Sequence, residues 1–252
     1  MITQYHRPQT LEEALKLLAQ PNTRPLGGGI VLTQKSDESF AVVDLQALGL
    51  DKLRKSGDKL EIGASVTLNR LLESPYIPPA LAETLRLDAP FNLRNAGTVA
   101  GTLVACDGRS PFATAMLALD AVLILALKNE KLFFGNYLPL RVEKDQHNSP
   151  LQGKLILKIE IPLNAKLAFE TVARTPSDRP IVCAALAQWP SGRTRLALGG
   201  YGKSPILALD GNEPGGVESA ANNAFVEAAD EWASAEYRSE IAAVLAKRCL
   251  GK

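Results

Sequence analysis

Three consecutive glycines, Gly27 to Gly29, interrupt an otherwise apolar segment that reads PLGGGIVL from Pro25 to Leu32. Inside a regular element each glycine costs roughly 0.5–1 kcal/mol of conformational entropy relative to alanine. Glycines are therefore kept where the backbone needs a positive φ or where another group approaches it closely. A tight turn meets the first need, and a loop whose bare amides surround a phosphate meets the second. The segment predicts a break between two elements and leaves both interpretations open.

The residues around the glycines predict a small βαβ-like unit. Thr10-Leu11-Glu12-Glu13 has the form of a capping box, and apolar residues at helical spacing follow it, which predicts a helix over 11–19. A short strand is expected over 24–26, before the glycines, and a buried strand over 40–45, after them. The glycine segment then connects two strands.

The remainder of the chain predicts a mixture of helices and antiparallel strands, while residues 91–102 show no clear period. The patterns indicate a hairpin over 53–62, helices over 67–74, 79–87 and 110–119, strands over 121–127, 132–134, 155–161, 166–173, 181–189 and 194–198, and two C-terminal helices ending at Leu250. The last helix is expected to bury Tyr237, Ile241, Val244, Leu245 and Cys249. This order predicts an α+β fold rather than a repeated barrel or a doubly wound sheet.

The charge balance argues against polyanionic and membrane partners. The chain has 28 Lys and Arg residues against 27 Asp and Glu residues, a formal net charge of +1, which provides no electrostatic field for nucleic acid or an anionic membrane. The longest apolar stretch, Ala113 to Leu127, contains Asp120 and is shorter than the roughly 20 residues of a membrane helix. No signal-peptide pattern opens the chain. We therefore expect no nucleic acid, no membrane and a cytoplasmic location.

Cysteine and histidine are too few and too scattered to form a ligand set. The chain has three cysteines, Cys106, Cys183 and Cys249, and two histidines, His6 and His147. An odd number of cysteines at wide spacing predicts neither a disulfide framework nor a zinc or iron–sulfur site. We expect no bound metal and interpret the cysteines as small buried hydrophobic residues.

Two segments imitate nucleotide-binding motifs without matching them. A P-loop ending at Lys203 would need glycine at position 197, where Ala197 stands. The glycine run fails the G-x-G-x-x-G pattern because Leu32 stands three residues after Gly29. No histidine has a recognisable nucleophile beside it, and no pair of carboxylates stands out. We therefore expect no catalytic acid, base or nucleophile.

Two glycine-containing segments remain as candidate binding loops, residues 26–31 and 97–102, each beside a predicted element. Consecutive backbone N–H groups without a Cβ in the way can surround the negative charge of a diphosphate. Two such loops are what a long dinucleotide would need if it lay across two lobes. Tight turns at domain corners remain the alternative.

Several segments, in order, resemble one known family. PLGGGIVL resembles the first loop, and LRNAGTVAGTLVACDGRSPFATAMLALDA the second loop, of the FAD-binding medium subunits of molybdenum hydroxylases, a family that includes subunits of carbon monoxide dehydrogenase and xanthine dehydrogenase. The opening YHRPQTLEEALKLL and the C-terminal segments TRLALGGYGKSPI and SAEYRSEIAAVLAKRCL resemble that family as well. The resemblance covers nearly the whole chain.

The resemblance implies a PCMH-type FAD-binding domain of two lobes, residues 1–55 and 56–163, followed by a C-terminal domain, residues 164–252, made of a small antiparallel sheet and helices. It implies an oxidoreductase subunit that passes electrons between the iron–sulfur clusters of a partner and an external acceptor. The implied partners are a 2Fe-2S small subunit and a large subunit that holds the molybdenum cofactor. By position, the implied FAD-binding residues are Leu26, Gly27, Gly28, Gly29, Ile30, Val31, Thr98, Val99, Ala100, Gly101, Thr102, Asp107 and Ser110.

At four positions the side chains depart from the usual pattern of the family. Ile30 and Val31 stand where a hydroxyl and an acid are usual, Ala100 stands at a usual glycine, and Pro111 replaces an acid after Ser110. A hydrogen bond to a charged group contributes ~1.5–3 kcal/mol, so its loss would weaken FAD binding. These departures motivate a second hypothesis, a structural or assembly subunit that has lost flavin. An unrelated α+β binding module is the third.

Overall fold

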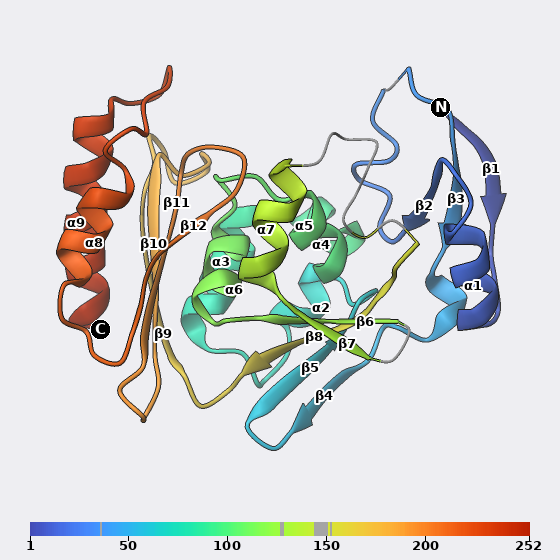
Figure 1. Ribbon diagram of the computed structural model, residues 1–252, viewed down its shortest axis with the longest axis horizontal. Coiled ribbons are helices and arrows are strands. Elements are labelled where there is room, and N and C mark those ends of the chain that lie inside the picture. The colour runs from blue at the N-terminus through green and yellow to red at the C-terminus, as the bar shows by residue number, and fades with distance from the viewer. Residues whose placement is uncertain (36, 127–128, 144–150, 152) are drawn as a thin grey trace. The chain divides into compact units, whose positions relative to one another are not determined.

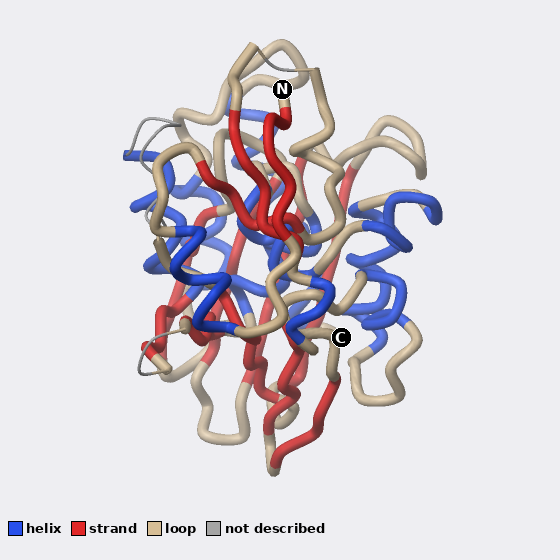
Figure 2. The backbone as a smooth tube through the Cα atoms, turned by 90° about the vertical axis from the view of Figure 1, so that its right-hand side faces the viewer, coloured by secondary structure: helices blue, strands red, loops and turns tan. Residues whose placement is uncertain are grey.

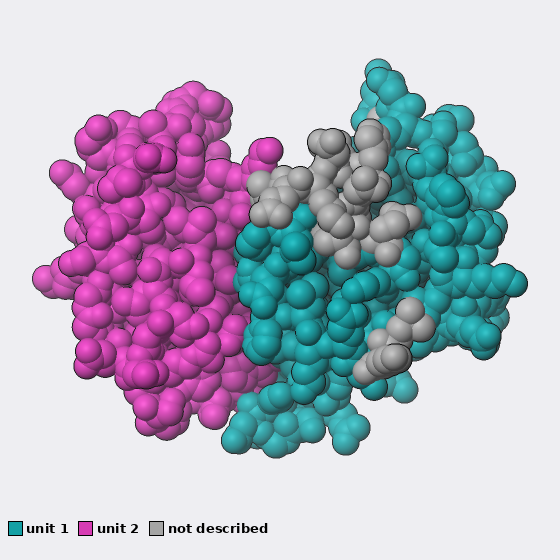
Figure 3. All heavy atoms as spheres, viewed as in Figure 1, with its two compact units in different colours: residues 1–74, 91–105, 122–160 teal, residues 75–90, 106–121, 161–252 magenta. Residues whose placement is uncertain are grey.

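The computed structural model describes residues 1–35, 37–126, 129–143, 151 and 153–252 (Figure 1). The chain divides into two compact units, shown in Figure 3. The first unit comprises residues 1–74, 91–105 and 122–160, and the second comprises residues 75–90, 106–121 and 161–252. Each unit is described by itself below. The expected division into three domains stays a prediction.

The first unit begins with a parallel three-stranded sheet of order β1-β3-β2 (Figure 2). Its elements are β1 (Ile2–His6), α1 (Leu11–Leu18), β2 (Thr23–Leu26) and β3 (Phe40–Asp44). The expected helix is confirmed, because the Thr10 side chain accepts a hydrogen bond from the Glu13 N–H and caps α1. Strand β1 was not expected. Its burial pattern is almost entirely exposed, so it gives no alternating apolar signal.

An antiparallel-paired sheet of order β4-β5-β8-β6-β7 forms the rest of the strand structure in the first unit. Its strands are β4 (Leu53–Ser56), β5 (Lys59–Gly63), β6 (Val122–Leu125), β7 (Glu130–Phe133) and β8 (Ile156–Pro162), and a short 3-10 helix, η1 (Gln46–Leu48), precedes β4. The β4–β5 hairpin confirms the expected one. In β8 the residues at alternate positions are buried, which confirms a strand with one wet side.

Four helices complete the first unit: α2 (Leu68–Leu72), α4 (Phe91–Ala96), α5 (Val99–Ala105) and α7 (Phe134–Glu143). The Thr67 side chain caps α2 as expected by accepting from the Arg70 N–H. The segment without a clear period, 91–102, forms α4 and the start of α5 with Gly97 and Thr98 between them, although its sequence predicted no helix. No residue of α4 is buried, so the helix has no apolar stripe from which a period could be recognised.

The second unit contains a four-stranded antiparallel sheet of order β12-β11-β10-β9 between two layers of helices (Figure 1). The strands are β9 (Lys166–Val172), β10 (Val182–Gln188), β11 (Thr194–Gly199) and β12 (Ile206–Gly211), and the helices are α3 (Pro79–Asp88), α6 (Pro111–Ala118), α8 (Val217–Ala224) and α9 (Ala235–Leu250). Val182 and Ala184 belong to the core shared with α8 and α9, whereas Cys183 contacts Thr114 of α6. Because neighbouring strand residues point to opposite faces, β10 is covered on both sides. Strand β12 was not expected.

Helix α9 buries Leu245 and Cys249 as expected and packs Ile241 against the core, while the two other residues of the expected stripe are exposed. Tyr237 and Val244 are 42% and 43% exposed. The buried residues are Arg238, Ser239, Ala242, Leu245, Ala246 and Cys249. Small side chains on this face let the helix approach the sheet closely. Arg238 is tolerated inside because its guanidinium donates to Asp230 and to the carbonyl oxygens of Ala228 and Ala233.

The observed helices and sheets confirm the expected α+β class. Within the described ranges, no helix is long and apolar enough to cross a membrane. In the same residues no three His, Cys, Asp or Glu side chains gather into a group that could hold a metal ion.

Candidate functional site

The glycine run forms a loop that follows the carboxyl end of β2 in the parallel sheet. Leu26 pairs with Asp44 of β3, and the Leu26 carbonyl accepts from the Leu45 N–H at 3.1 Å. The chain then turns at Gly29, whose φ is +74°. The Thr33 N–H donates to the Gly29 carbonyl at 3.0 Å and closes the turn. The carboxyl edge of a parallel sheet is a common place for ligands in α/β proteins.

The backbone of this loop lies directly against the second glycine-containing segment. A Cβ on Gly28 would lie 1.8 Å from the Ala96 carbonyl oxygen, and a Cβ on Gly27 would lie 2.8 Å from Oγ1 of Thr98. A Cβ on Gly97 would in turn lie 3.1 Å from Cδ1 of Ile30. The two segments therefore pack so closely that neither Gly27 nor Gly28 has room for a side chain. The group that approaches the glycine run is another part of the same chain.

The amides of the first loop remain open despite this packing. Among the described residues, the N–H groups of Gly27 to Leu32 have no hydrogen-bond acceptor. The loop is half-buried from Gly27 to Ile30, and Val31 is 53% exposed. Unpaired N–H groups around a positive-φ glycine form a concave arrangement that suits an anion. The first loop can accept a phosphate group without breaking an existing backbone hydrogen bond.

The second segment differs from the expectation of an open amide run. The N–H of Val99 donates to the Val66 carbonyl at 2.8 Å, and the N–H of Thr102 donates to the Thr98 carbonyl at 2.9 Å. Gly101 donates its N–H to Oγ1 of Thr98 at 3.2 Å. Thr98 thus caps α5, and the segment is a helix start rather than a loop.

The Thr102 side chain is engaged as well. The Thr102 hydroxyl donates to the Thr98 carbonyl at 2.9 Å, so its proton is already used. Of the backbone N–H groups of residues 98–102, those of Thr98 and Ala100 have no acceptor within the described part of the chain. Thr98, Val99 and Ala100 are buried, whereas Gly101 is exposed. This segment mainly supports the first loop and offers few donors of its own.

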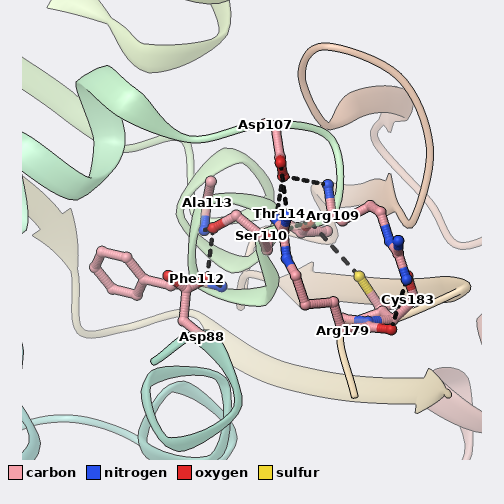
Figure 4. Close-up of polar contacts among 10 residues, drawn as sticks. Asp88, Asp107, Arg109, Ser110, Phe112, Ala113, Thr114, Arg179 and Cys183 are labelled. Atoms are coloured by element: carbon pink, nitrogen blue, oxygen red, sulfur yellow. Dashed lines mark hydrogen bonds and ion pairs between the residues drawn. The ribbon is translucent and has the colours of Figure 1, made fainter. Parts of the chain in front are cut away.

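Asp107 and Ser110 belong to the second unit, while the other candidate residues belong to the first. The Asp107 carboxylate pairs with the Arg179 guanidinium, which donates from Nη1 at 2.8 Å, and accepts from the Arg109 N–H at 2.9 Å (Figure 4). Burial by itself would raise the pKa of Asp107, but the hydrogen bonds from Arg179 and Arg109 outweigh it and lower that pKa. Asp107 therefore holds its own unit together.

Ser110 is the N-cap of α6, where its Oγ accepts from the Ala113 N–H at 3.1 Å and donates to Oδ1 of Asp88 at 2.5 Å (Figure 4). Asp88 also accepts from the Phe112 N–H at 3.1 Å, and burial raises the pKa of Asp88. Pro111 takes the first helical position, which needs no N–H donor. An acid from α3, Asp88, thus contacts the start of α6, which no local pattern could have indicated.

Gly108 and the segment from Gly200 to Gly202 form a second close backbone contact. A Cβ on Gly108 would lie 1.8 Å from the Tyr201 carbonyl oxygen. The Gly108 N–H donates to the Gly202 carbonyl at 3.0 Å, and the Gly200 N–H donates to the Gly108 carbonyl at 2.6 Å. Of the glycines that imitate a P-loop, Gly199 and Gly200 have no room for a Cβ, and the Gly200 amide is engaged by the chain itself.

The three cysteines are buried, as the sequence predicted, and none of them forms a disulfide. The Cys183 thiol donates to Oγ1 of Thr114 at 3.7 Å (Figure 4). Burial raises the pKa of Cys183 to about 12 and that of Cys249 to about 12. Both thiols are protonated at neutral pH, so neither is a nucleophile or a metal ligand in this state.

Residues 1–164 match the family described as the FAD binding domain in molybdopterin dehydrogenase. The chain is 28% identical to the uncharacterized protein YgfM of Escherichia coli K12, covering 97% of this chain and 94% of that protein. It is 26% identical to the carbon monoxide dehydrogenase medium chain of Hydrogenophaga pseudoflava, over 98% of this chain and 95% of that one. Its structure resembles a chain of reconstituted carbon monoxide dehydrogenase from Oligotropha carboxidovorans, with a TM-score of 0.80 and 25% identity. The match covers 98% of this chain and 96% of that chain.

Proposed function

The chain belongs to the family of FAD binding domains in molybdopterin dehydrogenases, and from this premise we propose that it carries electrons between the iron–sulfur clusters of a partner and an external acceptor. The flavin supplies the redox chemistry when it is bound. The contribution of this chain is to bind the cofactor, fix its orientation and limit the access of water. No side chain has to act as an acid or a base in this role.

The open amides of the first loop carry the proposal. The N–H groups of Gly27 to Leu32 lack acceptors within the described residues, and a diphosphate would supply them. Hydrogen bonds to a charged acceptor contribute roughly 1.5–3 kcal/mol each. A few such bonds compensate for the apolar side chains of Ile30 and Val31, because an amide donates whatever side chain its residue carries.

The proposed binding residues divide into donors and supports. Leu26 to Val31 provide the loop that holds the diphosphate, and the amides of Thr98 and Ala100 add donors from the neighbouring segment. Val99, Gly101 and Thr102 keep the start of α5 in place through their own hydrogen bonds. Asp107 and Ser110 organise the second unit, and in this proposal they do not contact the phosphates.

The proposed partners are a 2Fe-2S small subunit and a large subunit with the molybdenum cofactor. The names of the relatives support the proposal. One is a medium chain, and another is the subunit alpha of the 6-hydroxypseudooxynicotine dehydrogenase complex of Paenarthrobacter nicotinovorans, 28% identical over 96% of this chain. Both names describe parts of larger assemblies.

A titration of the purified protein with FAD tests the cofactor assignment. Quenching of flavin fluorescence and the visible spectrum of the protein after gel filtration report binding. FMN is the matched control because it has the same ring and a single phosphate. We expect retention of FAD and much weaker retention of FMN. Equal retention of both would contradict recognition of the diphosphate by the loop.

A flavin-free structural subunit is the second candidate. It is favoured by the amides of Val99, Gly101 and Thr102, which are already occupied by the chain. A protein that remains colourless after incubation with FAD, yet assembles with an iron–sulfur subunit and a molybdenum subunit, would support this candidate over the first.

A further inference from the structure

An exposed tryptophan in the second unit is contacted by two arginines from separate segments. Trp232 lies between α8 and α9 and is 40% exposed. The guanidinium carbon of Arg174, from the loop after β9, lies 4.2 Å from the centroid of its ring. That of Arg109, from the segment before α6, lies 4.7 Å from the same centroid. We refer to Arg109, Arg174 and Trp232 as the tryptophan patch.

The backbone holds Arg109 in a fixed orientation. Its Nε donates to the Pro180 carbonyl at 2.9 Å, and its Nη2 donates to the Arg179 carbonyl at 2.9 Å. Burial and the nearby charge of Arg179 lower the pKa of Arg109. A fixed arginine loses little conformational entropy when a partner binds to it, so the patch is prepared for an interaction.

The neighbouring arginines are neutralised. Arg179 pairs with Asp107, and Arg238 pairs with Asp230 at 2.7 Å. These pairs occupy the carboxylates of Asp107 and Asp230, whose charges also act on Arg109 without forming an ion pair with its guanidinium.

The arginines of the patch have no such partner. Within the described residues, neither the guanidinium of Arg109 nor that of Arg174 has a carboxylate within 4.0 Å, and the same residues provide no hydrogen-bond acceptor for the side chain of Arg174 or for the indole N–H of Trp232. Asp178 and Glu231 are exposed in the same two loops, but neither forms an ion pair with a described residue. Among the described residues, the patch therefore presents two guanidinium groups without an ion-pair partner, and the free donors of Arg174 and Trp232, beside an aromatic ring.

We propose that the tryptophan patch is a docking surface for an acidic segment of another subunit, whose carboxylates pair with Arg109 and Arg174 while its apolar atoms cover Trp232. This proposal rests on the proposed function, because it takes the partner from the same complex. Guanidinium groups match carboxylates with two parallel hydrogen bonds. Tryptophan and arginine are also the residues that most often dominate binding energy at protein interfaces.

A protein partner fits the patch better than a small anion or a nucleic acid. Residues 174–179 are all exposed, so the donors lie on a surface loop, whereas small ligands are held in concave sites that bury most of their surface. A nucleic acid requires a broad positive field, and the chain has a net charge of +1.

The test measures assembly of the full-length chain with its two partner subunits. Arg174→Glu reverses one charge of the patch, Arg174→Gln removes it more gently, and Trp232→Ala removes the ring. Arg248→Glu is the matched control, because Arg248 is exposed in α9 of the same unit and has no ion pair among the described residues. Thermal unfolding verifies that each variant is folded.

We expect Arg174→Glu and Trp232→Ala each to raise the dissociation constant of the complex about tenfold or more, and Arg174→Gln to raise it less. The control should leave it unchanged, and added salt should reduce the difference between Arg174→Glu and the wild type. Unchanged assembly of the folded Arg174→Glu and Trp232→Ala variants would overturn the proposal. Competition of inorganic phosphate or an oligonucleotide for the patch, with assembly unaffected, would also overturn it. Failure of the wild-type chain to bind FAD or to assemble would instead refute the proposed function.

Discussion

Glycines allow close backbone contacts in both compact units, and two of these contacts have opposite consequences. In the first unit Gly28 lies against Ala96, and the amides of Gly27 to Leu32 stay without acceptors in the described residues. In the second unit Gly108 lies against Tyr201, and the two segments donate their amides to each other. Close packing at glycines therefore leaves open amides in one place and forms a sealed contact in the other.

The largest expected effect is on the sealed contact. Gly108→Ala would place a Cβ 1.8 Å from one backbone oxygen and 2.7 Å from another, so the backbone must move and its two hydrogen bonds must weaken. We expect the free energy of unfolding to fall by about 3 kcal/mol, measured by chemical denaturation. Gly211→Ala is the control, because its Cβ would make only an ordinary contact at 3.7 Å. Equal stability of the two variants would contradict a sealed contact.

Gly28→Ala should affect binding as well as stability. The added Cβ displaces the first loop from the Ala96 carbonyl and moves the open amides. We expect a loss of roughly 2 kcal/mol in stability and an increase of at least about tenfold in the dissociation constant for FAD, which corresponds to about 1.4 kcal/mol. Fluorescence titration measures the second quantity. A destabilised variant with unchanged FAD affinity would show that the loop amides do not hold the cofactor.

Thr98→Val tests the support of the open loop. Its hydroxyl caps α5 by accepting from the Gly101 N–H, and loss of an N-cap costs about 1 kcal/mol. Thr98→Ser keeps the hydroxyl and should restore most of that stability. If Thr98→Ser is as unstable as Thr98→Val in denaturation experiments, the methyl contacts rather than the cap are responsible.

The smallest expected effect is the pH dependence of the second unit, where two acids shift in opposite directions. The lowered pKa of Asp107 means that the stability from its pairing is present above its unfolded pKa and is lost as pH falls through the folded value. The raised pKa of Asp88 means that its contribution is full below the unfolded pKa and decreases as pH rises through the folded value.

Asp107→Asn should therefore make the free energy of unfolding less sensitive to a fall in pH. Asp88→Asn should make it less sensitive to a rise in pH above the usual pKa of an aspartate. Chemical denaturation at a series of pH values measures both slopes. Matching slopes in the two variants would contradict the assigned directions.

Local patterns predicted the elements that local chemistry stabilises. Thr10 and Thr67 cap their helices, and the β4–β5 hairpin follows the expected turn. The prediction was wrong where tertiary contacts decide the outcome. Helix α4 has no buried face to recognise, and α9 turns Arg238 inward because Asp230 neutralises it. The binding assignment of Leu26 to Val31 stays a prediction.

The sequence by itself determined that the backbone is bare at Gly27 to Gly29 and at Gly108, because the absence of a Cβ belongs to the residue. Only the tertiary structure decided which atoms enter the space left there, since those atoms come from segments distant in the chain. Whether an amide is open or engaged depends on the acceptors that folding brings near it. Similar glycines therefore led to an open loop in one unit and to a closed contact in the other.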